Sequence, residues 1–246
     1  MSRKASRTLI NKHHQLDKQR RQAASKGDRA TEEAIAAEIE SLGEHGARGD
    51  TSRLLLEWLP VEELKDSGRI LRLLEVGALS TRNACSLSGL FESVHIDLNS
   101  QEPGILQQDF MDRRVPTDDE DRFDVLSLSL VLNFVPDAAL RGEMLKRTRE
   151  FLRGTHNSTE ARAEEFFPCL FIVLPRSCLD NSRYFTESKF ESIMSMLGYS
   201  MTRMKMTQKL AYSLWRKAAA ANIARVSKKE INPGRIRNNF VITLQH

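Results

Sequence analysis

The chain has 246 residues, of which 40% are hydrophobic, 28% are charged and three are cysteine, and its formal net charge is +4. A chain of this size can bury one sizeable core with room for an appendage. No apolar run approaches the roughly eighteen residues of a membrane span, and the basic N-terminus has no apolar signal core. We therefore expect no membrane partner and no cleaved export signal, and the odd number of scattered cysteines fits a reducing compartment.

The N-terminal residues are basic and poor in large apolar side chains. Residues 1–29 hold nine lysines or arginines against two aspartates, a composition that favours a helical or partly ordered arm. Such an arm could lie along RNA, carry a nuclear import signal or be a solvated extension. Helices are predicted at 30–42 and 52–59. We expect residues 1–62 to form the arm and a small helical lobe, and residues 63–246 to form the main domain.

Two short apolar runs, each followed by a distinctive polar or flexible residue, predict a ligand site. Residues 70–76 have the pattern of a buried strand and are closed by Gly77, and a second run, 94–97, ends in Asp97. In a doubly wound parallel sheet these strand ends lie side by side. Gly77 would let a ligand approach the backbone, and Asp97 would accept hydrogen bonds from ribose hydroxyls. The pattern indicates a nucleoside site, although it also occurs in α/β proteins without a ligand.

The turn after the first of these strands contains a single glycine. A dinucleotide site requires a Gly-x-Gly-x-x-Gly turn that places a pyrophosphate on a helix N-terminus. Here residues 77–83 read Gly-Ala-Leu-Ser-Thr-Arg-Asn. A diphosphate is therefore disfavoured as the ligand.

The third predicted strand, residues 105–110, ends in a carboxylate beside an aromatic ring. An adenine ring needs apolar surfaces on its faces and an acceptor for its exocyclic amine, which Phe110 and Asp109 could supply. These two residues are candidate cofactor contacts.

A central strand is predicted over residues 125–132, followed by a helix that starts at Pro136-Asp137. Serines are unfavourable inside such a strand unless they find partners, so Ser129 faces either the ligand or a backbone group. Asn133 follows the strand and is the better candidate for a substrate contact, because its amide both donates and accepts hydrogen bonds.

The C-terminal half is expected to complete the sheet. Strands are predicted at 169–174, at 199–206 continuing towards 215, and at 239–244, with a helix at 187–197. The segment 176–184 either closes over a substrate or is a plain connection.

Basic residues are dense near the C-terminus. Between residues 216 and 237 a single acid, Glu230, accompanies Arg216, Lys217, Arg225, Lys228, Lys229, Arg235 and Arg237. This density would gain affinity from the neutralisation of phosphates, and a solvated face is the alternative. The histidines and cysteines have no ligand spacing, so we predict no metal site.

The most distinctive motifs are Leu-Leu-Glu-Val-Gly-Ala-Leu at 73–79, His-Ile-Asp-Leu-Asn at 95–99, Gln-Asp-Phe at 108–110, Ser-Leu-Val-Leu-Asn-Phe-Val-Pro-Asp at 129–137 and Asn-Asn-Phe at 238–240. Together they resemble the fungal nucleolar methyltransferases that modify adenine N1 in large-subunit ribosomal RNA, over most of residues 65–246. The resemblance implies an α/β fold of the class I methyltransferase type. In this Rossmann-like fold, a seven-stranded sheet has helices on both faces and its last strand is antiparallel.

The resemblance also implies S-adenosylmethionine as the cofactor, with Gly77 facing its methionine part and Asp97 holding its ribose. The other candidate contacts are Asp109, Phe110 and Ser129 for the cofactor and Asn133 for the target adenine. The implied partner is large-subunit rRNA or a preribosome, and the implied compartment is the nucleolus. The same family includes animal S-adenosylmethionine sensors that act through protein partners without turnover, and such a sensor is the alternative function. The basic segments favour the RNA enzyme.

Overall fold

The computed structural model describes residues 50–100, 102–154, 166–218 and 220–245. The basic arm and the helix predicted at 30–42 lie outside these ranges. The chain divides into the compact units Met1–Asp50 and Thr51–His246, whereas the sequence placed a boundary after residue 62. None of the helices within the described ranges is long and apolar enough to cross a membrane.

Two short helices precede the sheet and belong to the second unit. They are α3 (Ser52–Trp58), which confirms the helix predicted at 52–59, and α4 (Val61–Asp66). Leu55 of α3 and Leu64 of α4 are buried in one cluster with residues of the first strand, including Leu71. Because their apolar faces are buried there, the two helices complete the sheet domain.

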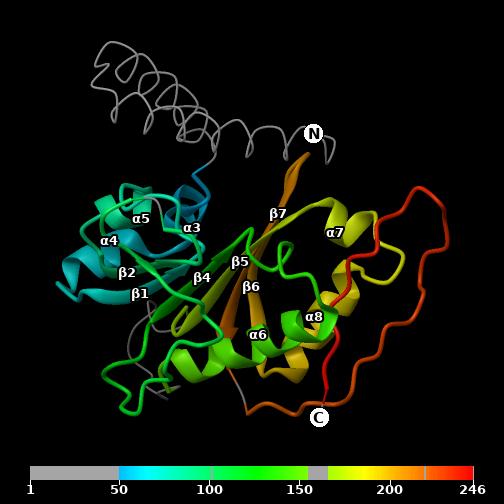
Figure 1. Cartoon of the computed structure of the whole chain (residues 1–246). Helices are drawn as coiled ribbons and strands as arrows, with labels where there is room; N and C mark the ends of the chain where they lie inside the picture. Colours follow the sequence, from blue (N-terminus) through cyan, green and yellow to red (C-terminus); the bar gives the residue numbers. More distant parts are fainter. Residues whose placement is uncertain (1–49, 101, 155–165, 219, 246) are drawn as a thin grey trace, which may run out of the picture. The chain divides into compact units, whose positions relative to one another are not determined.

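A seven-stranded sheet forms the centre of the domain (Figure 1). Its strands are β1 (Leu71–Val76), β2 (Phe91–Asp97), β3 (Ile105–Gln107), β4 (Val125–Ser129), β5 (Cys169–Pro175), β6 (Tyr199–Met206) and β7 (Leu210–Lys217). Their order is β3-β2-β1-β4-β5-β7-β6. Only β7 runs against its neighbours β5 and β6, while the remaining pairs are parallel. The predicted doubly wound sheet with one antiparallel strand is confirmed.

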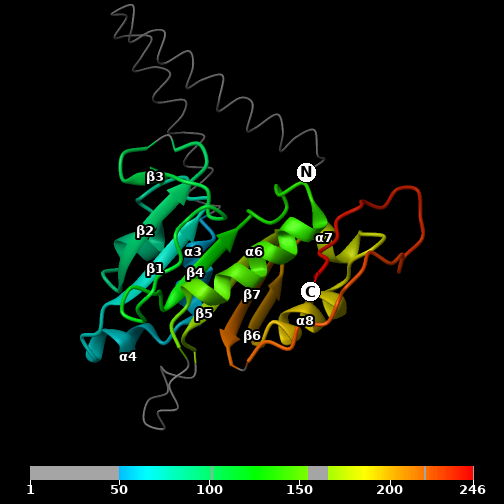
Figure 2. The same ribbon diagram turned by 60° about the horizontal axis from the view of Figure 1, so that its bottom comes forward.

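Successive residues of the central strands are buried on opposite faces of the sheet, which explains their nearly continuous apolar sequences. On one face Leu74, Leu126 and Ile172 join a cluster with α6 (Ala138–Phe151) and α8 (Glu187–Met196), which lie in front of the strands in Figure 2. On the other face the alternate residues pack on α3, α4 and α5 (Ala84–Leu87). The helices thus cover both faces.

Two helices begin where the sequence provides a cap. Asp137 accepts hydrogen bonds from the N–H groups of Ala139 and Leu140 and starts α6, as the Pro136-Asp137 pair predicted. Thr186 accepts from the N–H of Lys189 and starts α8. The segment after β5 also contains a short helix, α7 (Ser177–Asp180).

Several predictions about the strands were wrong, including the continuation of the strand at 199–206 towards 215, which the structure divides into β6 and β7. β4 ends at Ser129 instead of residue 132, because Leu130 turns the chain with a positive φ of 59°. Residues 239–244 form no strand. Within this segment Leu244 forms an isolated antiparallel bridge with Val226. The seventh strand is β7, which follows β6 after a turn where the hydroxyl of Thr207 accepts from the N–H of Leu210.

Candidate functional site

The carboxyl ends of three neighbouring strands form the candidate site. β1 lies where the sheet reverses its winding, with β2 on one side and β4 on the other, and open α/β sheets bind ligands at such a switch point. Val76 is level with Ile96 in β2 and with Leu128 in β4. The residues that come next, Gly77, Asp97 and Ser129, therefore lie at one edge of the sheet, as predicted from the sequence.

Gly77 makes the turn after β1 and has a φ of +75°. Its N–H and that of Ala78 both donate to the carbonyl of Ile96, over 2.8 and 3.1 Å. A Cβ atom at Gly77 would lie 2.7 Å from Cγ2 of Val131, in the loop after β4. Both the backbone angle and the space therefore require glycine here.

Asp97 is the last residue of β2 and is partly exposed. Its Oδ1 accepts from the N–H of Asn99 at 2.7 Å, and its carbonyl accepts from the N–H of Gln108 at 2.9 Å. These bonds fix the turn, and among the described residues only Asn99 donates to the carboxylate. The second oxygen, Oδ2, remains available to a ligand.

The structure separates the roles of Asp109 and Phe110. β3 ends at Gln107, and Oδ1 of the partly exposed Asp109 accepts from the N–H of Met111 at 2.7 Å. The ring of Phe110 is 2% exposed and lies 5.0 Å from the ring of Phe151, in the core. The sequence suggested that Phe110 offers an aromatic face at the sheet edge. This prediction is wrong, because the ring is buried in the core.

The loop after β4 contains an unsatisfied polar atom. Oγ of Ser129 lies 2.8 Å from Oγ1 of Thr51, so this serine bonds to a side chain rather than to the backbone. Oδ1 of Asn133 is buried and has no hydrogen-bond partner among the residues that the structure describes. Native proteins leave few such atoms without a partner, and each exception needs an explanation, such as a bound water or a ligand contact. Beside it, the ring of Phe134 is 65% exposed.

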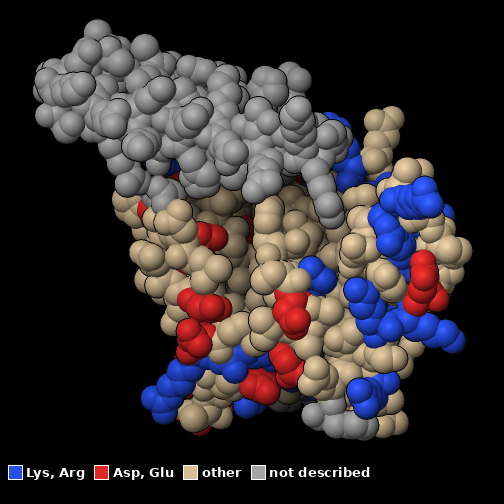
Figure 3. All heavy atoms as spheres, turned by 45° about the vertical axis from the view of Figure 1, so that its right-hand side comes forward, with Lys and Arg blue, Asp and Glu red and all other residues tan. Residues whose placement is uncertain are grey.

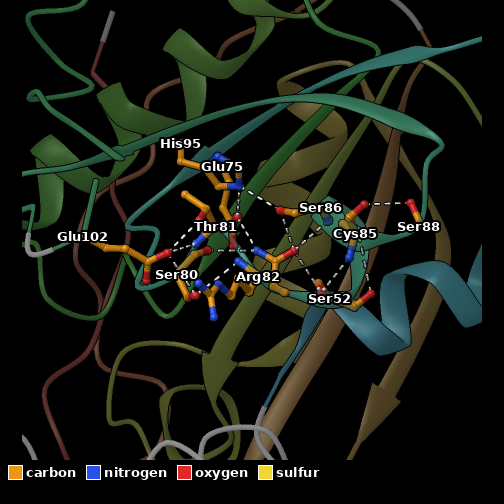
Figure 4. A network of polar contacts seen from close by, with 11 residues as sticks. Ser52, Glu75, Ser80, Thr81, Arg82, Cys85, Ser86, Ser88, His95 and Glu102 are labelled. Atoms are coloured by element: carbon orange, nitrogen blue, oxygen red, sulfur yellow. Dashed lines mark hydrogen bonds and ion pairs between the residues drawn. The ribbon is translucent and has the colours of Figure 1, made fainter. Parts of the chain in front are cut away.

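A polar network lies next to the glycine turn (Figure 4). Nδ2 of Asn83 donates to Oε2 of Glu75 at 2.6 Å, and Oδ1 of Asn83 accepts from the N–H of Ser86, which caps α5. Nε2 of His95 lies 2.8 Å from Oγ of Ser86 and 3.4 Å from Oε2 of Glu75. These contacts hold side chains of β1, β2 and α5 together next to the turn at Gly77.

A second contact fixes the far end of the turn. Oε1 of Glu102 accepts from the N–H and the hydroxyl of Thr81, over 2.9 and 2.6 Å, and from the hydroxyl of Ser80. Partial burial raises the pKa of Glu102, but these hydrogen bonds outweigh that effect and the pKa is lowered overall. Glu102 is therefore an anion at neutral pH and holds the loop 77–83 beside the β2–β3 connection.

Comparison with known proteins identifies the family. Residues 37–242 match the family model described as "25S rRNA (adenine(2142)-N(1))-methyltransferase, Bmt2". The chain belongs to the Bmt2 family.

Two curated relatives support this assignment. A Schizosaccharomyces pombe protein named 25S rRNA adenine-N(1) methyltransferase is 34% identical over 258 aligned positions, which cover 95% of this chain and 89% of that protein. A Saccharomyces cerevisiae protein named 25S rRNA (adenine(2142)-N(1))-methyltransferase is 36% identical over 213 positions, which cover 85% of this chain and 58% of that protein. Both names describe an enzyme, and neither describes a sensor.

The chain is also similar to a solved structure of 1,6-didemethyltoxoflavin-N1-methyltransferase from Burkholderia thailandensis, with bound 1,6-didemethyltoxoflavin and S-adenosylhomocysteine. The TM-score is 0.46 at 16% identity, and the match covers 76% of this chain and 88% of that chain. The strand order of this Bmt2-family chain, with β7 antiparallel, is that of the class I methyltransferase fold.

In this member of the Bmt2 family, sequence reasoning missed the polar network around Asn83. One signal was present, since Glu75 is a carboxylate in a mostly apolar strand and stands two positions before the glycine turn. A carboxylate that is largely removed from water in this way requires a partner. The sequence could not indicate that Asn83 and His95 would supply it, because they come from two other elements.

His95 gives the Bmt2-family domain a pH dependence. Burial lowers its pKa from 6.5, although the charge of Glu102 opposes this. Below about pH 6.5 the unfolded chain binds a proton at this histidine more readily than the folded chain does. Stability is therefore constant well above pH 6.5 and falls as the pH drops through that value towards the lower pKa of the folded state. We expect the unfolding free energy to fall between about pH 7.5 and 5, and to fall less in His95→Gln. Equal slopes in thermal or urea unfolding of the two proteins would contradict this.

Proposed function

We propose that this Bmt2-family protein transfers a methyl group from S-adenosylmethionine to N1 of an adenine in large-subunit ribosomal RNA. The observation that carries the proposal is the level placement of Gly77 and Asp97 at the switch point of the sheet, in a chain of this family. The relatives' names supply the substrate class, and the geometry supplies a place for a nucleoside donor.

The residues at the edge fit this cofactor. Gly77 brings backbone without a side chain to the edge, as an approaching methionine part requires, and its conformation is fixed by Ile96 and Val131. Asp97 offers an oxygen to the ribose hydroxyls, and Asp109 offers a carboxylate to the exocyclic amine of the cofactor's adenine. When bound, S-adenosylmethionine supplies a methyl group on a sulfonium, which is already activated for transfer.

Phe110 and Ser129 contribute to the same site through other residues. The buried ring of Phe110 anchors the turn that carries Asp109. Ser129 holds Thr51, the residue before α3, against the end of β4. We infer that both residues position the side chains that contact the cofactor. Neither the ring of Phe110 nor the hydroxyl of Ser129 is itself the main cofactor contact.

The acceptor requires alignment more than acid or base catalysis. Adenine N1 carries a free lone pair at neutral pH, so the protein need not remove a proton before attack. Oδ1 of Asn133 has no partner among the described residues, and a rotation of this side chain would let it accept a hydrogen bond from the exocyclic amine of a target adenine. This would turn N1 towards the donor once the base is unpaired from its helix. The exposed ring of Phe134 stands beside it as an apolar surface.

The direct test is a transfer assay. The full-length protein is incubated with cofactor labelled in its methyl group and with unmodified large-subunit rRNA, and the RNA is digested to nucleosides. Labelled N1-methyladenosine is the expected product. Cofactor binding without any transfer to RNA or to preribosomal particles would refute the enzyme and support the sensor.

Asp97 provides a test of the cofactor site. We expect Asp97→Ala to weaken S-adenosylmethionine binding by about five- to 150-fold in calorimetry, since a hydrogen bond to a charged group contributes about 1–3 kcal/mol. Asp97→Asn retains an acceptor for the N–H of Asn99 and separates loss of charge from loss of the turn. Asp121→Ala, in an exposed loop, is the control. Affinity within about threefold of wild type in Asp97→Ala would remove Asp97 from the site.

We also propose that the protein acts in the nucleolus during ribosome biogenesis, on rRNA within a preribosome. Large-subunit RNA is made and processed there, so an enzyme that modifies a base before it is enclosed by ribosomal proteins would meet it there. Fluorescence microscopy of the tagged full-length chain, with a nucleolar marker, tests this. Exclusion from the nucleus would contradict it.

A further inference from the structure

The C-terminal segment packs into the core with one side and exposes basic residues on the other. We call residues 225–245 the strap. It runs along the domain beside α8 and α7, as the orange to red segment in Figures 1 and 2. Its apolar residues Phe240, Val241, Ile242 and Leu244 are buried in the main cluster, whereas Arg225, Lys228, Lys229 and Arg235 are exposed.

Hydrogen bonds hold the strap at the carboxyl edge of the sheet, where the candidate site lies. α7 begins two residues after β5 ends, and Nδ2 of Asn238 donates to the carbonyl of Ser177 in α7 at 2.6 Å. The N–H of Ile231 donates to the carbonyl of Arg183 at 2.7 Å, and the N–H of Arg183 donates to the carbonyl of Asn238 at 3.0 Å. The exposed cations of the strap are thus carried on a fixed backbone.

Two further cations join them from outside the strap. Nζ of Lys189, in α8, donates to the carbonyl of Ser227 at 3.3 Å, and the guanidinium of Arg183 reaches the carbonyl of Arg235 at 3.5 Å. We call Arg183, Lys189, Lys228, Lys229, Arg235 and Arg237 the basic face. Figure 3 shows lysine and arginine side chains gathered on the right of that view, with few acidic ones between them.

The charges of the basic face are not neutralised by ion pairs among the described residues. Burial lowers the pKa of Lys189, and the charge of Lys229 lowers it further, which indicates two ammonium groups near each other. Asp180, the nearest acid on α7, pairs with Arg176 at 2.7 Å. Glu187, Glu191 and Glu230 are exposed around the cluster. None of the described acids forms an ion pair with the six cations, so the face keeps its charge for a partner.

The structure also separates this face from other basic residues that the sequence grouped with it. Lys217 donates to the carbonyls of Arg149, Leu152 and Arg153, over 2.8–3.0 Å. Burial and the nearby charge of Arg149 lower its pKa to about 8. Lys217 therefore closes the C-terminal end of α6 and is not a phosphate contact.

The strap connects the basic face to the loop that holds Asn133. Arg141 is 8% exposed and donates to the carbonyl of Val241 in the strap at 2.7 Å. The same guanidinium donates to the carbonyls of Leu132 and Val135, over 3.1 and 2.9 Å. A partner seated on the strap would therefore have a fixed position relative to Asn133.

We propose that the basic face binds the phosphate backbone of the RNA that flanks the target adenine. This inference rests on the proposed function, which supplies the RNA, while the place on the protein comes from the charges of the strap and α8. Tyr184 lies under Lys228, whose Nζ is 4.3 Å from the ring centre, so a cation–π contact orients this ammonium group on the basic face. RNA bound here would deliver its adenine to the loop after β4.

The experiment compares two pairs of lysines in the full-length protein. Lys228→Gln/Lys229→Gln removes two charges from the basic face, and Lys205→Gln/Lys209→Gln removes two exposed charges near the β6–β7 turn. Binding to unmodified large-subunit RNA is measured by fluorescence anisotropy between about 50 and 200 mM salt. We expect the first variant to lose about three- to tenfold in affinity and about 1.4 in the slope of log affinity against log salt, since single-stranded contacts contribute about 0.7 each. We expect the control to stay near wild type.

Each result has a distinct meaning. Equal slopes in wild type and Lys228→Gln/Lys229→Gln, or an equal loss in both variants, would overturn the basic face as the RNA site. Calorimetry with S-adenosylmethionine should give wild-type affinity in both variants, so a loss there would indicate misfolding, and the single substitutions Lys228→Gln and Arg235→Gln would then carry the test. Failure of the proposed function is recognised separately, because wild type would bind RNA without producing N1-methyladenosine.

Discussion

Replacing Gly77 with alanine is expected to weaken S-adenosylmethionine binding by more than tenfold and to abolish measurable methyl transfer. The backbone at Gly77 has a φ of +75°, which costs an L-residue about 1–2 kcal/mol. The added Cβ would also lie 2.7 Å from Cγ2 of Val131, and overpacking of this kind costs about 1–3 kcal/mol. The turn can relieve the contact only by moving away from β4, which changes the surface offered to the methionine part.

Two variants separate strain from the steric contact. Gly89 has a φ of +73°, and a Cβ added there would meet no atom within 4 Å, so Gly89→Ala introduces the backbone strain alone and should leave cofactor affinity unchanged. Val131→Ala in the Gly77→Ala background removes the contacting methyl and should recover part of the affinity. Calorimetry on the four proteins decides the matter. Wild-type binding by Gly77→Ala would place the cofactor elsewhere.

Arg141→Met is expected to lower both the stability of the domain and its turnover. The guanidinium donates to the carbonyls of Leu132, Val135, Pro136 and Val241 and lies 4.6 Å from the ring centre of Phe240. Each buried group left without a partner costs about 1–3 kcal/mol, so we expect a fall of about 3–5 kcal/mol in urea unfolding. Because the Asn133 loop loses its anchor, kcat should fall more than cofactor affinity.

Glu150→Met provides the matched control, since Glu150 is an exposed residue of the same helix. It should change stability by less than about 0.5 kcal/mol. Arg141→Lys keeps the charge but replaces the planar fork by a single ammonium, so it should be intermediate. If Arg141→Met lost cofactor binding and turnover in equal proportion, the loop would not be acting through Asn133, and Asn133→Ala should then retain wild-type turnover.

The sequence was a reliable guide wherever one short segment determined the structure. The nearly continuous apolar runs predicted β1, β4 and β5, and the single glycine after β1 marked the left-handed turn. The placement of Gly77 and Asp97 at a common edge followed from the winding of parallel strands. These features depend on local composition and on general rules of chain connection.

The sequence was a poor guide where distant residues decide. An apolar run such as residues 240–242 has the same composition whether it pairs in a sheet or is held by an arginine, and here Arg141 binds its backbone. Phe110 follows a strand end in both interpretations, but the proximity of Phe151 in α6 places its ring in the core. The sequence also could not separate the basic residues that face solvent from those that have a structural role. Only the structure shows that Lys217 donates to a carbonyl at the end of α6.

The two edge strands of the sheet, β3 and β6, determine whether the sheets of two molecules can pair edge to edge. β3 at one edge has only three residues. β6 at the other edge is irregular between Met201 and Arg203 and exposes the cations Arg203 and Lys205. Short, irregular or charged borders disfavour the addition of a foreign strand. The protein thus combines a very apolar interior with borders that resist edge-to-edge aggregation at high concentration.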